Sequence, residues 1–220
     1  MKTLRWMIVG VVLAVCAGAI FYFLHQHYVL NKIIERLTAQ TRLAQVLVTG
    51  VNFDEGLRRN FTTVKFLEYT SKGEPLEPQY FTFPGHILQF QALVVRFDDR
   101  FVKAGDKMRG KSVALFLKAF ALNGPNTKEF IITPVDEVPL GYRTGKHVSG
   151  YEKSFWRDFW KFAFDPAFAK QRGVKNVQIE APGTMFIPGF LYTIVIEHDG
   201  GLRIDTKPLP EILKNEKFIK

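Results

Sequence analysis

Residues 6–24 read WMIVGVVLAVCAGAIFYFL, a run of 19 residues without a charged or strongly polar side chain. As an α-helix, this segment would be roughly 28 Å long, which is close to the thickness of the hydrocarbon core of a bilayer. Within lipid, a helix is the only open-chain conformation that satisfies all of its own backbone polar groups. The sequence therefore predicts a transmembrane helix over residues 6–24, preceded by a short tail at residues 1–5.

Aromatic and imidazole side chains flank this apolar segment. Trp6 stands at its start, and Tyr22, His25, His27 and Tyr28 stand at or just beyond its end. Amphipathic rings of this kind concentrate at the two membrane–water interfaces. These five residues are therefore the predicted membrane boundary.

The distribution of fixed positive charge predicts the orientation of the segment. Lys2 and Arg5 precede it, whereas the first Lys or Arg after it is Lys32. Positive residues close to a membrane helix stay in the cytoplasm. We therefore expect a single-pass protein of a bacterial inner membrane, with a cytoplasmic N-terminus and an extracytoplasmic main domain.

A cleaved signal peptide is the alternative interpretation of the same residues. Lys2 and Arg5 would form its basic region, and Ala17-Gly18-Ala19 resembles a cleavage site. The apolar run continues for five residues beyond that site, which favours a permanent anchor. A lipoprotein site at Cys16 is not expected, because the bulky Val15 precedes it.

Small residues recur every four positions within the apolar segment, at Gly10, Ala14 and Gly18. On a helix they share one face, where small side chains allow a second helix to approach closely. We therefore expect these three residues to be a helix-packing face. The simpler alternative is that Gly and Ala are common in membrane helices.

The segment after the anchor, residues 25–50, has apolar residues near heptad spacing with charged residues between them. The pattern lasts only about two and a half heptads, which is too short to indicate a sustained coiled coil. We expect an amphipathic stalk helix that ends at Thr49-Gly50. Its apolar positions are Leu30, Ile33, Ile34, Leu37, Leu43, Ala44 and Leu47.

Residues 51–220 are expected to form a β-rich, sandwich-like domain, because short β-branched and aromatic segments alternate with Gly, Pro, Asn and Asp turns. The segment at residues 111–122 has an apolar run that is compatible with either a helix or a strand. The expected strands are residues 62–70, 79–83, 87–97, 111–122, 129–133, 176–180, 190–198 and 202–206.

A helical insertion is expected at about residues 150–173, within the β-rich domain. Its first helix places the aromatic residues on one half of a helical wheel and the charged residues on the other. Three interpretations remain open: a helix packed on the sheet, a helix in a lipid headgroup layer, or a partner-docking surface. The candidate residues are Tyr151, Phe155, Trp156, Phe159 and Trp160, with Lys153, Arg157 and Lys161.

The sequence carries no motif typical of catalysis, metal binding or cofactor binding. One Cys in 220 residues excludes internal disulfides and Cys-rich zinc sites. There is no HExxH, GxSxG, Walker or dinucleotide-binding pattern. We therefore predict no catalytic residue, no metal and no cofactor. An enzyme would need His86, His147 or His198 beside an acid in a cleft.

The formal net charge is +9, of which residues 1–50 contribute +4 (five Lys or Arg and one Glu). The remaining excess is spread along the chain, whereas nucleic-acid binding usually requires a concentrated basic face. No nucleic-acid partner is therefore expected. Anionic lipid headgroups or an acidic partner are better matches, and a plain solvated surface is the simpler alternative.

These features predict a non-catalytic accessory or scaffold subunit of a larger inner-membrane complex, hetero-oligomeric or oligomeric, with other integral membrane proteins as its partners. The alternative is an anchored periplasmic binding module for a glycan, lipid or peptide. An envelope enzyme is a third hypothesis.

Overall fold

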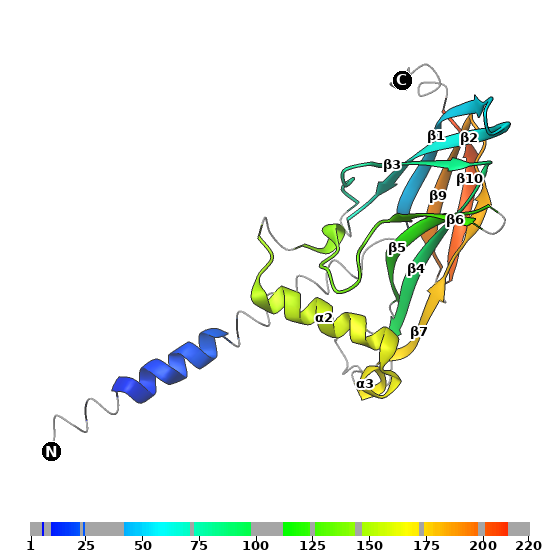
Figure 1. Ribbon diagram of the computed structural model, residues 1–220. Coiled ribbons are helices and arrows are strands. Elements are labelled where there is room, and N and C mark those ends of the chain that lie inside the picture. The colour runs from blue at the N-terminus through cyan, green and yellow to red at the C-terminus, as the bar shows by residue number, and fades with distance from the viewer. Residues whose placement is uncertain are drawn as a thin grey trace.

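The computed structural model shows a mainly β protein with two antiparallel sheets and a helical segment (Figure 1). It describes residues 6, 10–22, 24, 42–70, 73–97, 112–123, 126–143, 147–171, 174–197 and 201–210. The prediction of a mainly β domain with a helical insertion is confirmed.

The first sheet has the strand order β10-β9-β1-β2-β3, and β1 lies at its centre. Because β1 pairs with both β2 and β9, this sheet joins parts of the chain that are far apart in sequence. Its strands are β1 (Arg42–Asp54), β2 (Arg59–Glu68), β3 (Gln79–Pro84), β9 (Phe190–Ile196) and β10 (Leu202–Pro208).

The second sheet has the order β6-β5-β4-β7, and the short β8 also pairs with β4. The ambiguous segment at residues 111–122 is a strand here, and it pairs with both β4 and β6. The strands of this sheet are β4 (Ile87–Phe97), β5 (Ser112–Asn123), β6 (Asn126–Ile131), β7 (Val174–Glu180) and β8 (Gly183–Met185).

The two sheets share an apolar core. In β2, side chains alternate between the core and the surface, which is the period-two pattern of a half-buried strand. Phe66 from the first sheet stacks on Phe90 from the second at 5.2 Å between ring centroids, and it meets Phe116 edge-on at 5.3 Å. Seven of the 21 Phe residues of the sequence lie in this core or pack against it: Phe66, Phe81, Phe83, Phe90, Phe116, Phe130 and Phe186.

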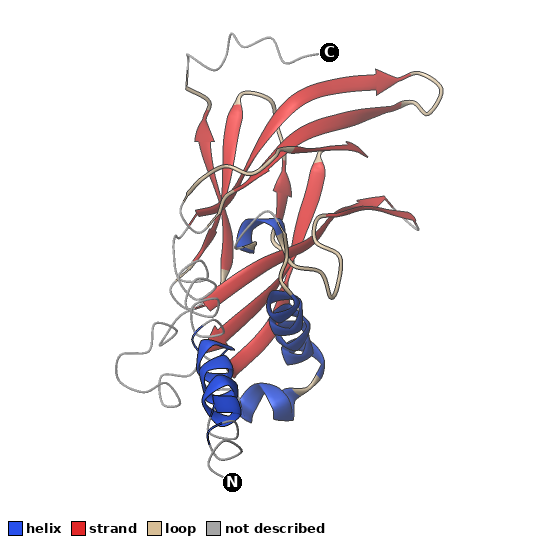
Figure 2. Cartoon of the chain, turned by 90° about the vertical axis from the view of Figure 1, so that its left-hand side faces the viewer, coloured by secondary structure: helices blue, strands red, loops and turns tan. Residues whose placement is uncertain are grey.

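A second apolar cluster lies on the other face of the second sheet, under α2 (Gly150–Phe164). Ser149 caps α2, since its hydroxyl accepts a hydrogen bond from the backbone N–H of Glu152. Asp165 follows α2, and its carboxylate accepts a hydrogen bond from Phe168 N–H at the start of α3 (Pro166–Gln171). Figures 1 and 2 show α2 and α3 together at one end of the sheets.

Residues 10–22 are helical, as are Trp6 and Leu24. Among the residues that the structure describes, however, no helix combines the length and the hydropathy needed to cross a membrane. The membrane helix expected over residues 6–24 is thus not supported by the structure. Residues 1–5 and the boundary residues His25, His27 and Tyr28 lie outside the described residues.

The prediction of a stalk helix over residues 25–50 is wrong from Arg42 onward, because the strand β1 begins there. Ala44, Val46 and Val48 are buried in the core between the sheets, while the residues between them are half-buried on the other face. A central strand with apolar residues on both faces mimics helical spacing over a short window, which explains the difference. Residues 25–41 lie outside the described part of the chain.

Candidate docking surfaces

The predicted docking residues of α2 divide into two groups. Trp156, Phe159 and Trp160 are fully or almost fully buried against the second sheet, so they belong to the core. Tyr151 and Phe155 are half-buried, and the three cations Lys153, Arg157 and Lys161 are exposed. The outward surface of α2 is therefore formed by the second group, and the first group holds the helix in place.

An aromatic groove runs along one flank of α2, with a volume of about 280 Å³. The Phe162 ring lies 5.6 Å from the Phe159 ring and also 5.6 Å from the Phe168 ring of α3, so the aromatic side chains are continuous across both helices. Apolar walls with a few polar groups at the rim are typical of sites that bind apolar chains or side chains. The groove is lined by Tyr151, Ser154, Phe155, Asp158, Phe159, Phe162 and Phe168.

A second cavity of about 420 Å³ adjoins the other flank of α2, and Ser154 belongs to both cavities. Three cations line it, Arg143, Lys153 and Arg157, together with Asp136 and Glu137 from the preceding loop. Arg157 donates a hydrogen bond to the Ser154 hydroxyl at 3.4 Å. The two flanks of α2 thus differ in chemistry: one is aromatic and the other is charged.

Lys161 lies on the ridge between the two flanks. Its Nζ is 2.8 Å from an Asp158 carboxylate oxygen and 5.7 Å from the centre of the Phe168 ring. An exposed ion pair of this kind contributes little to stability. The ion pair holds the Lys161 ammonium group beside the aromatic groove, where this ammonium group can also contact an anion.

Tyr151 stands at the N-terminal end of the groove. Burial raises the pKa of the Tyr151 hydroxyl, and the nearby Tyr22 contributes further in the same direction. Figures 1 and 2 show the helical segment at residues 10–22 at the same end of the molecule as α2.

The predicted helix-packing residues Gly10, Ala14 and Gly18 are exposed. A Cβ atom added at Gly10 or Gly18 would meet no atom within 4 Å. This face is therefore open among the described residues. The boundary residues Trp6 and Tyr22 are exposed as well.

A second apolar surface, which the sequence did not predict, lies on the outer face of the second sheet. Ile87 of β4 pairs with Met185 of β8. The pairing of β4 with β5 begins at Gln89 and Phe120, and its continuation by two residues brings Leu122 beside Ile87 on the other side. These three side chains are 56%, 51% and 64% exposed, respectively. We call them the cross-strand row. Only the pairing of the strands brings the three together, so a linear pattern could not have revealed the row.

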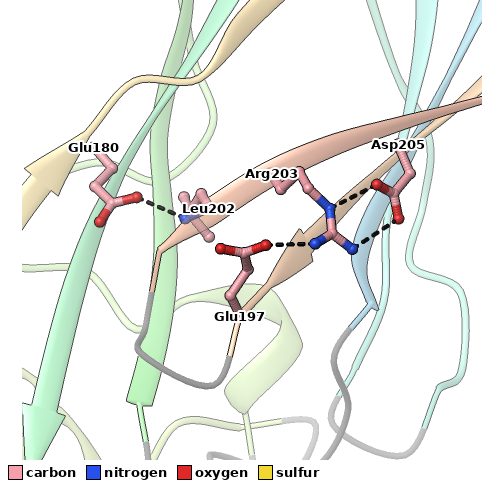
Figure 3. A network of polar contacts seen from close by, with 5 residues as sticks. All are labelled: Glu180, Glu197, Leu202, Arg203 and Asp205. Atoms are coloured by element: carbon pink, nitrogen blue, oxygen red, sulfur yellow. Dashed lines mark hydrogen bonds and ion pairs between the residues drawn. The ribbon is translucent and has the colours of Figure 1, made fainter.

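Polar contacts gather at the neighbouring edges of the two sheets, where β7 and β10 lie (Figure 3). A Glu180 carboxylate oxygen accepts a hydrogen bond from Leu202 N–H at 2.6 Å, which connects β7 to β10. Arg203 bridges Glu197 and Asp205. The hydrogen bond between the Arg203 and Asp205 side chains lowers the pKa of Asp205 and raises the pKa of Arg203. The Arg203 ion pairs lie within the first sheet, between β10 and the end of β9, whereas the hydrogen bond between Glu180 and Leu202 joins the two sheets.

The histidines that an enzyme would need are not grouped with acids in the described residues. His86 Nδ1 lies 3.0 Å from the Thr62 hydroxyl, His147 is exposed, and His198 lies outside the described part. Nor does the described part of the chain contain a group of three His, Cys, Asp or Glu residues that could hold a metal ion.

No family model, no curated protein and no solved structure matches this chain.

Glu68 is a half-buried acid that no pattern in the sequence had singled out. It continues the inward-facing series Thr62, Val64 and Phe66 of β2, and its cross-strand partner is the fully buried Ala44. Burial raises the pKa of the Glu68 carboxyl to about 7. The pKa of the Tyr142 hydroxyl is also raised, mainly by burial and to a smaller extent by the charge of Glu68. An acid at the end of an apolar strand pattern is the signal that could have identified this site.

Proposed function

We propose that this chain is a non-catalytic accessory or scaffold subunit of an inner-membrane protein complex, tethered by residues 6–24 and docking through its extracytoplasmic β-rich domain. The observation that carries the proposal is the cross-strand row of Ile87, Leu122 and Met185. Contiguous exposed apolar side chains on a sheet typically mark an interaction site.

The cross-strand row lies on the face of the second sheet that α2 covers only in part. α2 covers Leu93 and Val95 farther along β4, and these residues are buried in the second cluster. Ile87 faces the same side of β4, because residues 87, 93 and 95 are separated by even numbers of positions. One end of this sheet face is therefore covered by the chain itself and the other end is left for a partner.

The apolar residues 6–24 and the open face of Gly10, Ala14 and Gly18 support the tether and a contact with a second membrane helix. The tether would hold the domain at the membrane surface, which raises the effective concentration of the cross-strand row for an integral membrane partner.

Native mass determination after extraction in mild detergent tests the proposal, combined with photo-crosslinking from position 122 in native membranes. We expect a species heavier than the 25.2 kDa chain and a crosslinked membrane protein. Position 80 is the matched control, because Tyr80 is a large exposed residue on β3 of the other sheet. A lone chain under several mild conditions, without crosslinks from position 122, would refute the proposal.

A tethered binding module for a small ligand is the second candidate, and the charged cavity favours it. Its volume of about 420 Å³ lies within the range of small-ligand sites, and it presents Arg143, Lys153 and Arg157. Thermal-shift titration with inorganic phosphate and anionic sugars would distinguish this candidate. A saturable rise that Arg157→Ala abolishes supports a binding module, whereas no shift with any of these ligands counts against it.

A further inference from the structure

The helical residues 10–22 lie at the same end of the molecule as α2 and α3. Figures 1 and 2 both show this arrangement, with the β1–β2 hairpin at the opposite end. The electrostatic effect of Tyr22 on Tyr151 agrees with it, because such an effect requires the two hydroxyls to be near each other. If the apolar segment is the tether, then α2 and α3 are the part of the domain nearest to the bilayer.

The surface at this end has the side chains that suit a lipid headgroup layer. Phe164, the last residue of α2, is 73% exposed, although removal of a Phe side chain from water is favourable. At 100° per residue, Phe164 lies on one side of the Lys161 ridge and the groove residues Tyr151 and Phe162 lie on the other. Exposed aromatic side chains beside Lys and Arg on one helix surface are a combination found in helices that lie in a membrane interface.

The exposed acids of α2 and of its junction with α3 are already engaged, while Asp136 and Glu137 lie in the charged cavity that Lys153 also lines. Asp158 pairs with Lys161, and Asp165 accepts a hydrogen bond from the backbone of α3. Within the described residues, no salt bridge reaches the exposed Lys153 or Lys170. These ammonium groups can therefore bind phosphates while their aliphatic stems cover apolar surface.

We propose that α2 and α3 rest on the phospholipid surface, with Phe164 and the aromatic groove at the level of the upper acyl chains and Lys153, Lys161 and Lys170 on lipid phosphates. This inference rests on the tether of the proposed function. It adds that the same side of the domain always faces the bilayer. The cross-strand row therefore stays accessible to a protein partner.

Site-specific fluorescence in lipid nanodiscs tests this orientation with the full chain. In a Cys16→Ser background, Phe164→Cys and, as a matched control, Phe53→Cys are labelled with a small fluorophore. Phe53 is also an exposed Phe (61%), but it lies in β1 near the hairpin at the opposite end of the molecule. Lipids with a nitroxide near the headgroup then serve as the quencher.

We expect quenching at position 164 to exceed quenching at position 53 by several fold. Equal and weak quenching at both positions, in discs that retain the chain, would overturn the membrane contact and leave the tether intact. Protection of position 164 from aqueous iodide without lipid quenching would indicate a protein contact and would also overturn it. Failure of the chain to remain in the discs would refute the tether and, with it, this inference.

Discussion

The indole Nε1 of Trp160 donates a hydrogen bond to the backbone carbonyl of Glu137 at 3.1 Å. This bond connects the middle of α2 to the loop before η1 (Leu140–Tyr142), 23 residues earlier in the chain. Trp156 lies one turn earlier in α2 and is equally buried, but its Nε1 has no acceptor in the described part of the protein. Two neighbouring indoles therefore hold α2 in different ways, one by a polar contact and one by packing alone.

Replacing each Trp by Phe separates these contributions. Trp160→Phe should lower the free energy of unfolding by about 1–2 kcal/mol more than Trp156→Phe, because only the first change removes a hydrogen bond and leaves its acceptor unpaired. Trp156→Phe also removes a buried donor without a partner, which offsets part of the lost packing. Circular dichroism of the full chain during denaturation in mild detergent measures the free energy of unfolding of both variants. Equal losses would show that the bond to Glu137 contributes nothing.

Gly183→Ala should disrupt the cross-strand row from a distance. A Cβ atom at Gly183 would lie 2.4 Å from Gln89 Cγ and 3.2 Å from the Leu88 carbonyl oxygen, so β8 would have to move away from β4. We expect a loss of about 1–3 kcal/mol in the free energy of unfolding and faster hydrogen exchange at Phe90 and Phe186, whose N–H groups donate to the Pro182 and His86 carbonyls across this pairing.

Gly50→Ala is the matched control, because Gly50 is also a strand glycine and a Cβ atom there meets nothing within 4 Å. It should change stability by less than about 1 kcal/mol. Normal β8 exchange in Gly183→Ala would contradict the close approach of the two strands.

Glu68 should make the domain less stable as the pH rises. Its pKa is about 7 in the folded state against an ordinary value of 4.5, so the folded state binds more protons between these values. The free energy of unfolding therefore falls from pH 4.5 to pH 7 and stays lowered above that. We expect a loss of about 1–2 kcal/mol, less than the full pKa difference implies, because the side chain keeps some exposure.

Glu68→Gln isolates this effect, since an amide of similar shape does not ionise. The variant should be more stable than the natural chain at pH 8, and the difference should shrink as the pH is lowered to 5. Thermal unfolding of both proteins across this range measures it. A difference that does not change with pH would mean that Glu68 does not titrate there.

Introduction of a positive charge into the cross-strand row should weaken partner binding without unfolding the domain. Leu122→Lys and Met185→Lys place ammonium groups where we propose an apolar interface, and burying an unpaired charge costs several kcal/mol. Recovery of the complex from native membranes should fall at least tenfold in each variant. Tyr80→Lys should leave recovery unchanged, and an equal loss in that control would indicate a general folding defect.

Most strands could be predicted from the sequence because Gly, Pro and Asn turns separate them, and β4 matches the expected residues 87–97. β1 was missed because a central strand carries apolar side chains on both faces, which resembles a helix over a short window. β8 was missed because it is only three residues long and stands directly after Pro182. Its pairing with β4 depends on tertiary contacts that no local pattern contains.

The helical insertion was predicted correctly, and its cap residues explain why. Ser149 begins α2, and Asp165-Pro166 separates α2 from α3. The sequence did not reveal which aromatic residues of α2 face the sheet. The apolar residues cover half of the helical wheel, whereas only the centre of that half contacts the sheet. Trp156, Phe159 and Trp160 lie at its centre and are buried, whereas Tyr151 and Phe155 lie at its edge and form the groove.

Retention of the chain in membranes is the measurement on which the proposed function depends most directly. Membranes from cells that make the full chain are extracted with alkaline carbonate, and the intact mass of the protein is determined in the pellet and in the supernatant. We predict that the protein stays in the pellet with residues 6–24 still attached. A protein in the supernatant whose mass shows cleavage near Ile20 would contradict the tethered subunit.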